Sequence, residues 1–250
     1  MARGNFSDAA ALLLWCVAAA LGCDSRGMER GPQQAGPETA ASTVELRYVE
    51  TEQRTPSESA PGGSWVKSVR YPQIEGGVAS EIQSAVNQAI AAHVAKYACD
   101  GPGDQQFTGV ATRGDGTLLS VKYEAMWMCA SMPAPQSKTG GLTFDLRTGR
   151  RVDLGEEVAD ASRRDALERR VVQGAKAAAS RKLGRDAAYC PEPGRTSEFF
   201  LTDSAAVFVG MFPSHVDAAC DVEVSIPLGE LRPFLRSGSV LAGGAPTGSG

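Results

Sequence analysis

The apolar positions of the first folded stretch change period once, and each period predicts an element. Apolar side chains alternate over 44–48 and 65–71, which predicts two strands; the second should end at Pro72, because proline cannot donate to a ladder. From Gly77 the spacing becomes helical and indicates one amphipathic helix that stops near Cys99. The apolar positions of this helix are Val78, Ile82, Val86, Ile90, Val94 and Tyr97.

Two hairpins follow. A strand over 107–112 turns at Asp115-Gly116 into Leu119–Trp127, where apolar and polar residues alternate strictly. Asp-Gly tolerates the positive φ of a tight turn. A second hairpin runs from 142–146 through Thr148-Gly149 into 152–154.

The remaining chain predicts a helix and a final group of strands. Helical spacing extends over Gly155–Leu183, with charged residues on the opposite face. Strands are expected at 198–201, 206–212 and 222–226, and a short helix at 227–235. The fold class is therefore α+β, a largely antiparallel sheet with two main helices and a short C-terminal helix.

The N-terminus reads as an export signal. A continuous apolar run from Ala9 to Leu21 leads through Gly22 to Cys23, which predicts a lipoprotein signal over 1–22 and a lipid on the Cys23 thiol. Ala18-Ala19-Ala20 also fits an ordinary secretory cleavage site, which would release a soluble secreted protein. An uncleaved anchor is the third alternative, but about 13 apolar residues fall short of a span. All three interpretations export the chain.

Composition sets the domain boundaries and excludes one class of partner. A net charge of −4 and a pI near 5.4, without a basic block, argue against nucleic acid. Residues 23–42 are rich in Gly, Pro, Gln and Ala and read as a flexible tether with a reach of about 25 Å. A globular domain is expected over 43–236 and a disordered tail over 237–250. No later apolar run approaches membrane-spanning length, so membrane contact is expected through the lipid anchor alone.

Four cysteines remain once Cys16 leaves with the signal and Cys23 takes lipid. An even count in an exported chain predicts disulfides, and three pairings are possible. Equal separation and matching context, a helix before the first cysteine and a strand pair before the second, favour Cys99 with Cys129 and Cys190 with Cys220. Zinc would need closely spaced ligand pairs such as C-x-x-C, and the sequence has none. We expect no metal and no cofactor.

The chain has two histidines. His93 lies beside the apolar stripe of its helix and is expected to be a packed or capping residue. His215, with Ser214 and Asp217 nearby, is the one candidate for a hydrolytic site, but the strained elbow and oxyanion hole of a serine hydrolase have no signature here.

Three further motifs have structural explanations. Arg113-Gly114-Asp115 falls on a hairpin turn, where Gly and Asp serve geometry. Glu156-Glu157 begins a helix and favours its dipole. Met126-Trp127-Met128 places Trp127 on one face of its strand and both methionines on the other. Packing in a central strand is the simpler interpretation of this triplet, and a face offered to a ligand is the alternative.

Several stretches resemble a known family. Tyr71-Pro72-Gln73-Ile74 before a helix carrying Asn87, the hairpin Phe144–Leu154, Phe199–Asp203 and Val224–Leu231 resemble an exported domain of unknown function. It occurs in the lysozyme-responsive anti-sigma-V factor and ahead of some peptidoglycan deacetylase domains. Members often carry Gly-Gly-Ala-His before the Phe-Asp-Leu strand; here Gly140-Gly141 runs into Leu142-Thr143 without the histidine.

These observations favour a non-catalytic lipoprotein of the bacterial cell envelope, facing the periplasm or exterior. The resemblance implies a binding or sensing module whose partner is a cell-wall glycan or a protein that attacks the wall. An envelope hydrolase using His215 and nearby carboxylates, among them Asp221, is the alternative.

Overall fold

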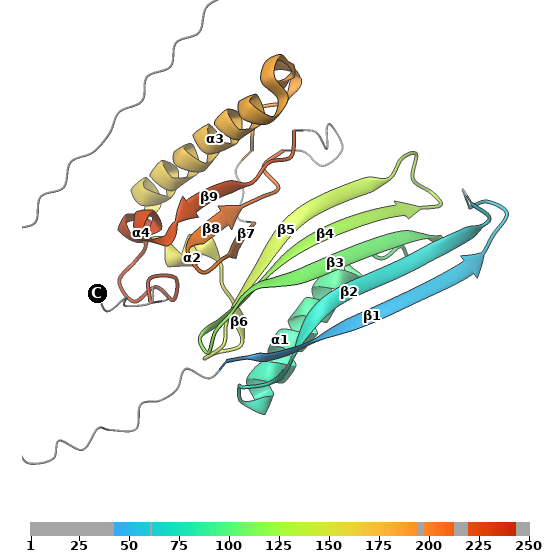
Figure 1. Ribbon diagram of the computed structural model, residues 1–250, viewed down its shortest axis with the longest axis horizontal. Helices are drawn as coiled ribbons and strands as arrows, with labels where there is room; N and C mark the ends of the chain where they lie inside the picture. The colour runs from blue at the N-terminus through green and yellow to red at the C-terminus, as the bar shows by residue number, and fades with distance from the viewer. Residues whose placement is uncertain (1–42, 61, 195–197, 213–219, 244–250) are drawn as a thin grey trace, which may run out of the picture. The chain divides into compact units, whose positions relative to one another are not determined.

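The computed structural model describes residues 43–60, 62–194, 198–212 and 220–243, and its strands form two sheets. Figure 1 shows the larger sheet, in the order β1-β2-β3-β4-β5-β6, with α1 across one face, and α3 alongside β9 of the smaller sheet β7-β8-β9. All pairings are antiparallel except β2–β3. The strands are Glu45–Pro56, Ser64–Gly76, Gly103–Gly114, Leu118–Cys129, Gln136–Asp145, Arg150–Arg151, Phe199–Leu201, Ala205–Phe208 and Val224–Pro227, numbered β1 to β9. The helices are α1 Ser80–Ala95, α2 Leu154–Glu157, α3 Ala161–Leu183 and α4 Leu228–Leu231, with 3-10 turns at Gly184–Tyr189 and Arg232–Phe234.

The first core lies between α1 and the larger sheet. Val86, Ile90 and Val94 of α1 pack against Phe107, Tyr123 and other buried strand residues. Asn87 fixes the helix to β2, because its side chain accepts from the Ile74 N–H at 2.8 Å and donates to the Ile74 carbonyl at 2.9 Å. The α+β class and the helical stripe predicted from the sequence are confirmed.

The second core lies between α3 and the smaller sheet. Leu167, Val171, Ala175 and Ala179 recur every four residues along α3 and form its buried face. Gly174 lets the helix approach β9, since a Cβ there would lie 2.6 Å from a Val224 methyl. The strands therefore divide between two sheets, each with its own main helix.

The two sheets meet where β7 crosses β4 and β5. Gly141 makes this approach possible, because a Cβ there would lie 2.1 Å from the Phe199 carbonyl oxygen. Ser120 Oγ accepts from the Leu201 N–H at 2.7 Å, and Thr112 donates to the Leu201 carbonyl at 2.7 Å. These contacts satisfy backbone groups of β7 at the junction.

Both expected disulfides are present. Cys99 is bonded to Cys129 and Cys190 to Cys220, each with a sequence separation of 30. In the chain-entropy model, loops of this length contribute roughly 3–4 kcal/mol each. Cys99–Cys129 joins the segment after α1 to the end of β4.

The helix predicted over Gly155–Leu183 is wrong in one respect, because it is broken. Val158 has an extended backbone and bridges Leu235, while the Ala159 N–H donates to the Phe234 carbonyl at 3.0 Å. Asp160 then caps α3 by accepting from the Arg163 N–H at 2.8 Å. Pairing with a distant segment thus outweighs helical propensity at this point.

Two predicted boundaries are also wrong. β2 continues through Pro72 to Gly76. Its pairing with β3 covers only Lys67–Arg70, so Pro72 removes no hydrogen bond between β2 and β3. The disordered tail was expected from residue 237, but residues 237–243 pack on the domain, with Ser239 and Leu241 buried. Residues 244–250 lie outside the described part.

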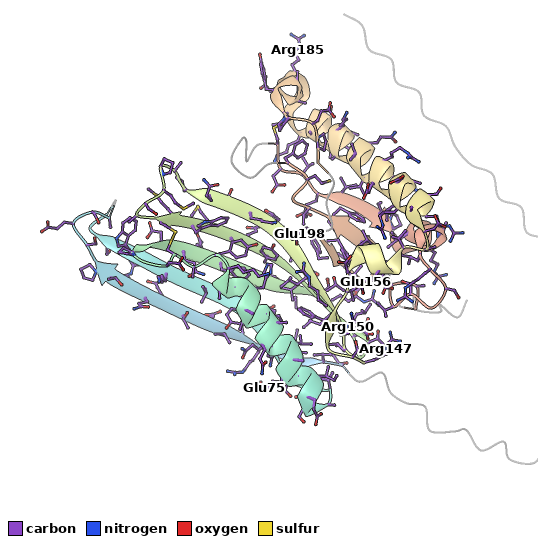
Figure 2. All side chains as sticks on the ribbon, turned by 180° about the vertical axis from the view of Figure 1, so that it is seen from behind. Glu75, Arg147, Arg150, Glu156, Arg185 and Glu198 are labelled. Atoms are coloured by element: carbon purple, nitrogen blue, oxygen red, sulfur yellow. A yellow bond between two sulfur atoms is a disulfide. The ribbon has the colours of Figure 1, made fainter. Side chains whose placement is uncertain are left out.

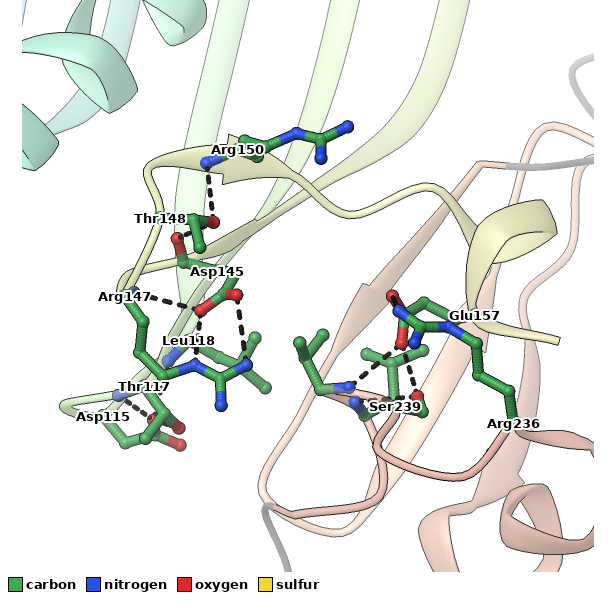
Figure 3. Close-up of polar contacts among 12 residues, drawn as sticks. Asp115, Thr117, Leu118, Asp145, Arg147, Thr148, Arg150, Glu157, Arg236 and Ser239 are labelled. Atoms are coloured by element: carbon green, nitrogen blue, oxygen red, sulfur yellow. Dashed lines mark hydrogen bonds and ion pairs between the residues drawn. The ribbon is translucent and has the colours of Figure 1, made fainter. Parts of the chain in front are cut away.

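Glu157 holds this C-terminal segment in place. Its carboxylate is buried and accepts from Arg236 at 3.0 Å, from the Ser239 hydroxyl at 2.5 Å and from the Val240 N–H at 3.0 Å (Figure 3). From its place in the sequence, Glu157 was expected to favour a helix dipole. The structure shows that it anchors residues 237–243, which we call the C-terminal strap.

Candidate functional site: the open face of the larger sheet

The face of the larger sheet away from α1 is partly uncovered along β3 and β4. Strict alternation turns Val121, Tyr123 and Ala125 into the core, and Trp127 follows them to pack on Tyr97 at 5.1 Å between ring centroids. The side chain of Met126 therefore points to the opposite face of the sheet, and 48% of this residue is exposed to solvent. Packing explains Trp127, whereas Met126 is exposed, and a ligand on this face stays a prediction.

A pocket of about 490 Å³ opens on this face. A smaller one of about 260 Å³ shares Gln106 and Met126 with it, so that the two form one groove across β3, β4 and β5. We call this the open-face groove. Its lining comprises Val66, Ser68, Asp104, Gln105, Gln106, Thr108, Glu124, Ala125, Met126, Trp127, Met128, Pro135, Ser137, Lys138 and Thr139.

Register and covalent bonds hold the larger pocket in shape. Met126 lies opposite Gln106 and Met128 opposite Asp104 in the β3–β4 ladder. Asp104 Oδ1 accepts from the Val66 N–H at 2.7 Å and ties β2 to β3. The Cys99–Cys129 disulfide closes the end of the strand pair directly after Met128. The groove is thus mostly apolar at its centre, with amide, hydroxyl and carboxylate groups around it.

At the β5 side of this groove, ion pairs run from the lining residue Lys138 along the edge of β5. Glu198 lies 3.6 Å from Lys138 Nζ and 3.6 Å from the Arg151 guanidinium, and accepts from the Gly141 N–H at 3.4 Å. Figure 2 shows Glu198 between the larger sheet and the smaller one. These side chains cover backbone groups of an edge strand that would otherwise be open to pairing.

On the face of the larger sheet that α1 covers, an aromatic cluster buries His93. His93 packs edge-on against Tyr97 at 5.5 Å and Tyr123 at 4.6 Å, and neither ring nitrogen has a hydrogen-bond partner among the described residues. Burial, with a smaller contribution from Arg151, lowers the pKa of His93 to about 4. Burial likewise raises the pKa of Tyr123, whose hydroxyl lies 2.9 Å from that of Tyr97. His93 is a packed residue, as predicted.

Gly140 has a packing role in the Gly-Gly segment that precedes the Phe-Asp-Leu strand. A Cβ at this position would lie 2.1 Å from the Tyr123 hydroxyl, so glycine makes room for the buried tyrosine. Gly141, on the other face, makes room for β7. The pair of glycines is therefore required by packing on both sides of β5.

The other predicted site residues fall into two groups. Cys23, His215, Ser214 and Asp217 lie outside the described residues. Asp221 is described; partial burial raises its pKa, against the effects of a hydrogen bond with Thr139 and the nearby Lys182 ammonium. Only this member of the hydrolase candidate can be placed.

Within the Arg-Gly-Asp tripeptide, Asp115 has the structural role expected of it, whereas Gly114 lies in β3 without a positive φ. Asp115 accepts from the Thr117 and Leu118 N–H groups, both at 2.8 Å (Figure 3). It also accepts from the Arg113 guanidinium at 2.7 Å. Several donors hold the carboxylate in its charged form, and the pKa of Asp115 is lowered despite partial burial. Within the described residues, no cluster of three or more His, Cys, Asp or Glu side chains could hold a metal ion.

The groove residues of β3 were missed because the strand was predicted to start at Phe107. Asp104, Gln105 and Gln106 lie before that point, and polar residues in a strand that borders a groove do not follow the apolar pattern. The available signal was the Met-Trp-Met triplet, since methionine on the side opposite a packed tryptophan leaves an apolar surface to be covered.

The fold of this chain resembles that of solved proteins from a family of unknown function. A crystal structure of a DUF3298 family protein from Bacteroides fragilis matches with a TM-score of 0.59 and 11% identity, over 81% of this chain and 98% of that one. A DUF3298 family protein from Pseudomonas aeruginosa PAO1 matches with a TM-score of 0.61 and 11% identity, over 79% and 96%. At this identity the likeness concerns the fold. No family model and no curated protein matches the sequence.

Proposed function

We propose that the protein is a non-catalytic binding or sensing module of the bacterial cell envelope, tethered by a lipid on Cys23 and facing the periplasm or exterior. Two disulfides support an extracytoplasmic location. Among the described helices, none is long and apolar enough to cross a membrane. The apolar run ending at Cys23 supports a lipid anchor in place of a span.

The observation that carries the binding function is the exposed apolar centre of the open-face groove. Val110, Met126 and Tyr189 are the large hydrophobic residues exposed among those described, and only Met126 lines this groove. An exposed methionine next to hydrogen-bonding groups suits a partner that presents apolar and polar groups together. The partner class, a cell-wall glycan or a protein that attacks the wall, rests on the family resemblance.

A pair of variants on one strand tests the site. Gln106→Arg places a bulky charge in the groove, whereas Val110→Arg places the same charge on β3 outside the groove lining. The tethered protein should capture its partner from solubilised envelopes by cross-linking, Gln106→Arg should lose this capture, and Val110→Arg should keep it. Equal capture by both variants would rule out the groove as the binding site.

The alternative function, an envelope hydrolase using His215 and nearby carboxylates, has a separate test. If the protein turned over glycan, peptide or ester substrates, His215→Ala would lower the rate by about two to four powers of ten. We expect no turnover and unchanged partner capture. Turnover abolished by this substitution would replace the binding function with a catalytic one.

A further inference from the structure

We propose that the open-face groove holds a soft monovalent cation, Cu(I) in the envelope and Ag(I) as its redox-inert analogue, on the thioethers of Met126 and Met128. The inference rests on the proposed function in that it assigns an inorganic ligand to the same groove. The ligands are the thioether sulfur atoms of two methionines, which differ from the thiolate and imidazole ligands typical of zinc.

The two thioethers share one face of β4. Residues i and i+2 of a strand point the same way, and their Cα atoms are about 6.6 Å apart. Each methionine has three rotatable bonds, so both sulfur atoms can reach one ion between them. Both side chains line the same pocket of about 490 Å³, and Met126 is 48% exposed, so a solvated ion has access.

The surroundings suit a soft cation in particular. Thioethers select Cu(I) over the hard cations that prefer oxygen ligands. Asp104 lies directly opposite Met128 in the ladder and supplies a negative charge beside the ion. Its Oδ1 is held by the Val66 N–H, which fixes the carboxylate in place. The four cysteines of the described domain are all in disulfides, so no described thiol competes.

The test uses the chain from Asp24 to Gly250, which retains every described element and omits Cys16 and Cys23. Titration with Ag(I) in a calorimeter should show one equivalent bound. Cu(I) should be retained against a colorimetric chelator, with sulfur neighbours in its X-ray absorption spectrum. Absence of stoichiometric Ag(I) binding overturns the proposal.

Leucine variants separate coordination from apolar contact. Met126→Leu/Met128→Leu conserves volume and apolar surface but removes both sulfur atoms, and it should abolish the one-equivalent binding. Met211→Leu is the matched control, because Met211 is 2% exposed and cannot meet a solvated ion. Asp104→Asn should weaken binding by about 10–100-fold, as expected for a group beside the ligands. Unchanged affinity in the double variant would refute the site.

Two independent measurements distinguish this inference from the proposed function. Ag(I) binding is measured on the purified protein without a partner, whereas partner capture is measured on the wild-type chain, because Met126 also lines the proposed partner site. Stoichiometric Ag(I) binding without partner capture would refute the proposed function alone. Partner capture without Ag(I) binding would refute the metal site alone.

Discussion

His93 should make the stability of the domain fall in mildly acidic solution. Its ring is buried between two tyrosines, and the pKa of His93 is lowered from 6.5 to about 4 in the folded protein. Between these two pKa values, His93 is protonated in the unfolded chain but remains neutral in the folded protein. Stability is complete above pH 6.5 and is lost as pH falls toward 4, because the unfolded state binds more protons in that window.

The magnitude follows from the size of the shift. Lowering the pKa of His93 from 6.5 to about 4 corresponds to about 3 kcal/mol at the lower end of the window, and about 2 kcal/mol is lost by pH 5. The charged groups around the ring act in both directions: Arg151, Lys96 and Lys138 lower the pKa of His93 and Glu198 raises it. Typical domains are stable by 5–15 kcal/mol, so a loss of this size is measurable.

The assay compares urea unfolding of the wild-type chain and His93→Phe between pH 4.5 and 7.5. Phenylalanine keeps an aromatic ring in the cluster and removes no hydrogen bond, since neither ring nitrogen has a partner among the described residues. The wild-type chain should lose stability relative to His93→Phe by about 2 kcal/mol between pH 7 and 5. A difference between the two proteins that stays constant over this range would refute the reasoning.

Four further outcomes are expected. In a urea titration, Gly141→Ala should lower the free energy of unfolding by more than about 3 kcal/mol, because its Cβ would lie 2.1 Å from a β7 carbonyl oxygen. The control Gly229→Ala should be nearly neutral, because no atom lies within 4 Å of the added Cβ. Glu157→Ala should lower the free energy of unfolding by about 2–4 kcal/mol and expose the C-terminal strap to limited proteolysis, since three donors lose their acceptor. Unchanged cleavage would contradict the anchoring role of Glu157. Cys190→Ser should cost roughly 3–4 kcal/mol by thermal unfolding, and non-reducing peptide mapping of the wild-type chain should recover only the two observed pairs. Cys23→Ala should move the protein from the membrane to the soluble fraction or leave an uncleaved precursor; a processed, membrane-bound mutant would refute lipidation.

The sequence by itself determined the elements whose signal is local. Alternation along β4 predicted which residues face the core, and the helical spacing of α1 predicted its buried stripe. The class, two main helices on a largely antiparallel set of strands, followed from the order of these periods. Even the disulfide pairing could be inferred, because the two pairs have the same separation of 30 along the chain.

Only the tertiary structure decided what depends on a distant neighbour. The helix expected from Gly155 breaks because Val158 pairs with Leu235, and Glu157 becomes a buried anchor because the C-terminal segment folds back on it. β7 packs on Ser120 and Gly141 of the larger sheet, and Met126, further along β4, is exposed. Periodicity reports that a face is apolar, but it carries no information on which segment covers that face, since burial is a property of packing between residues far apart in the chain.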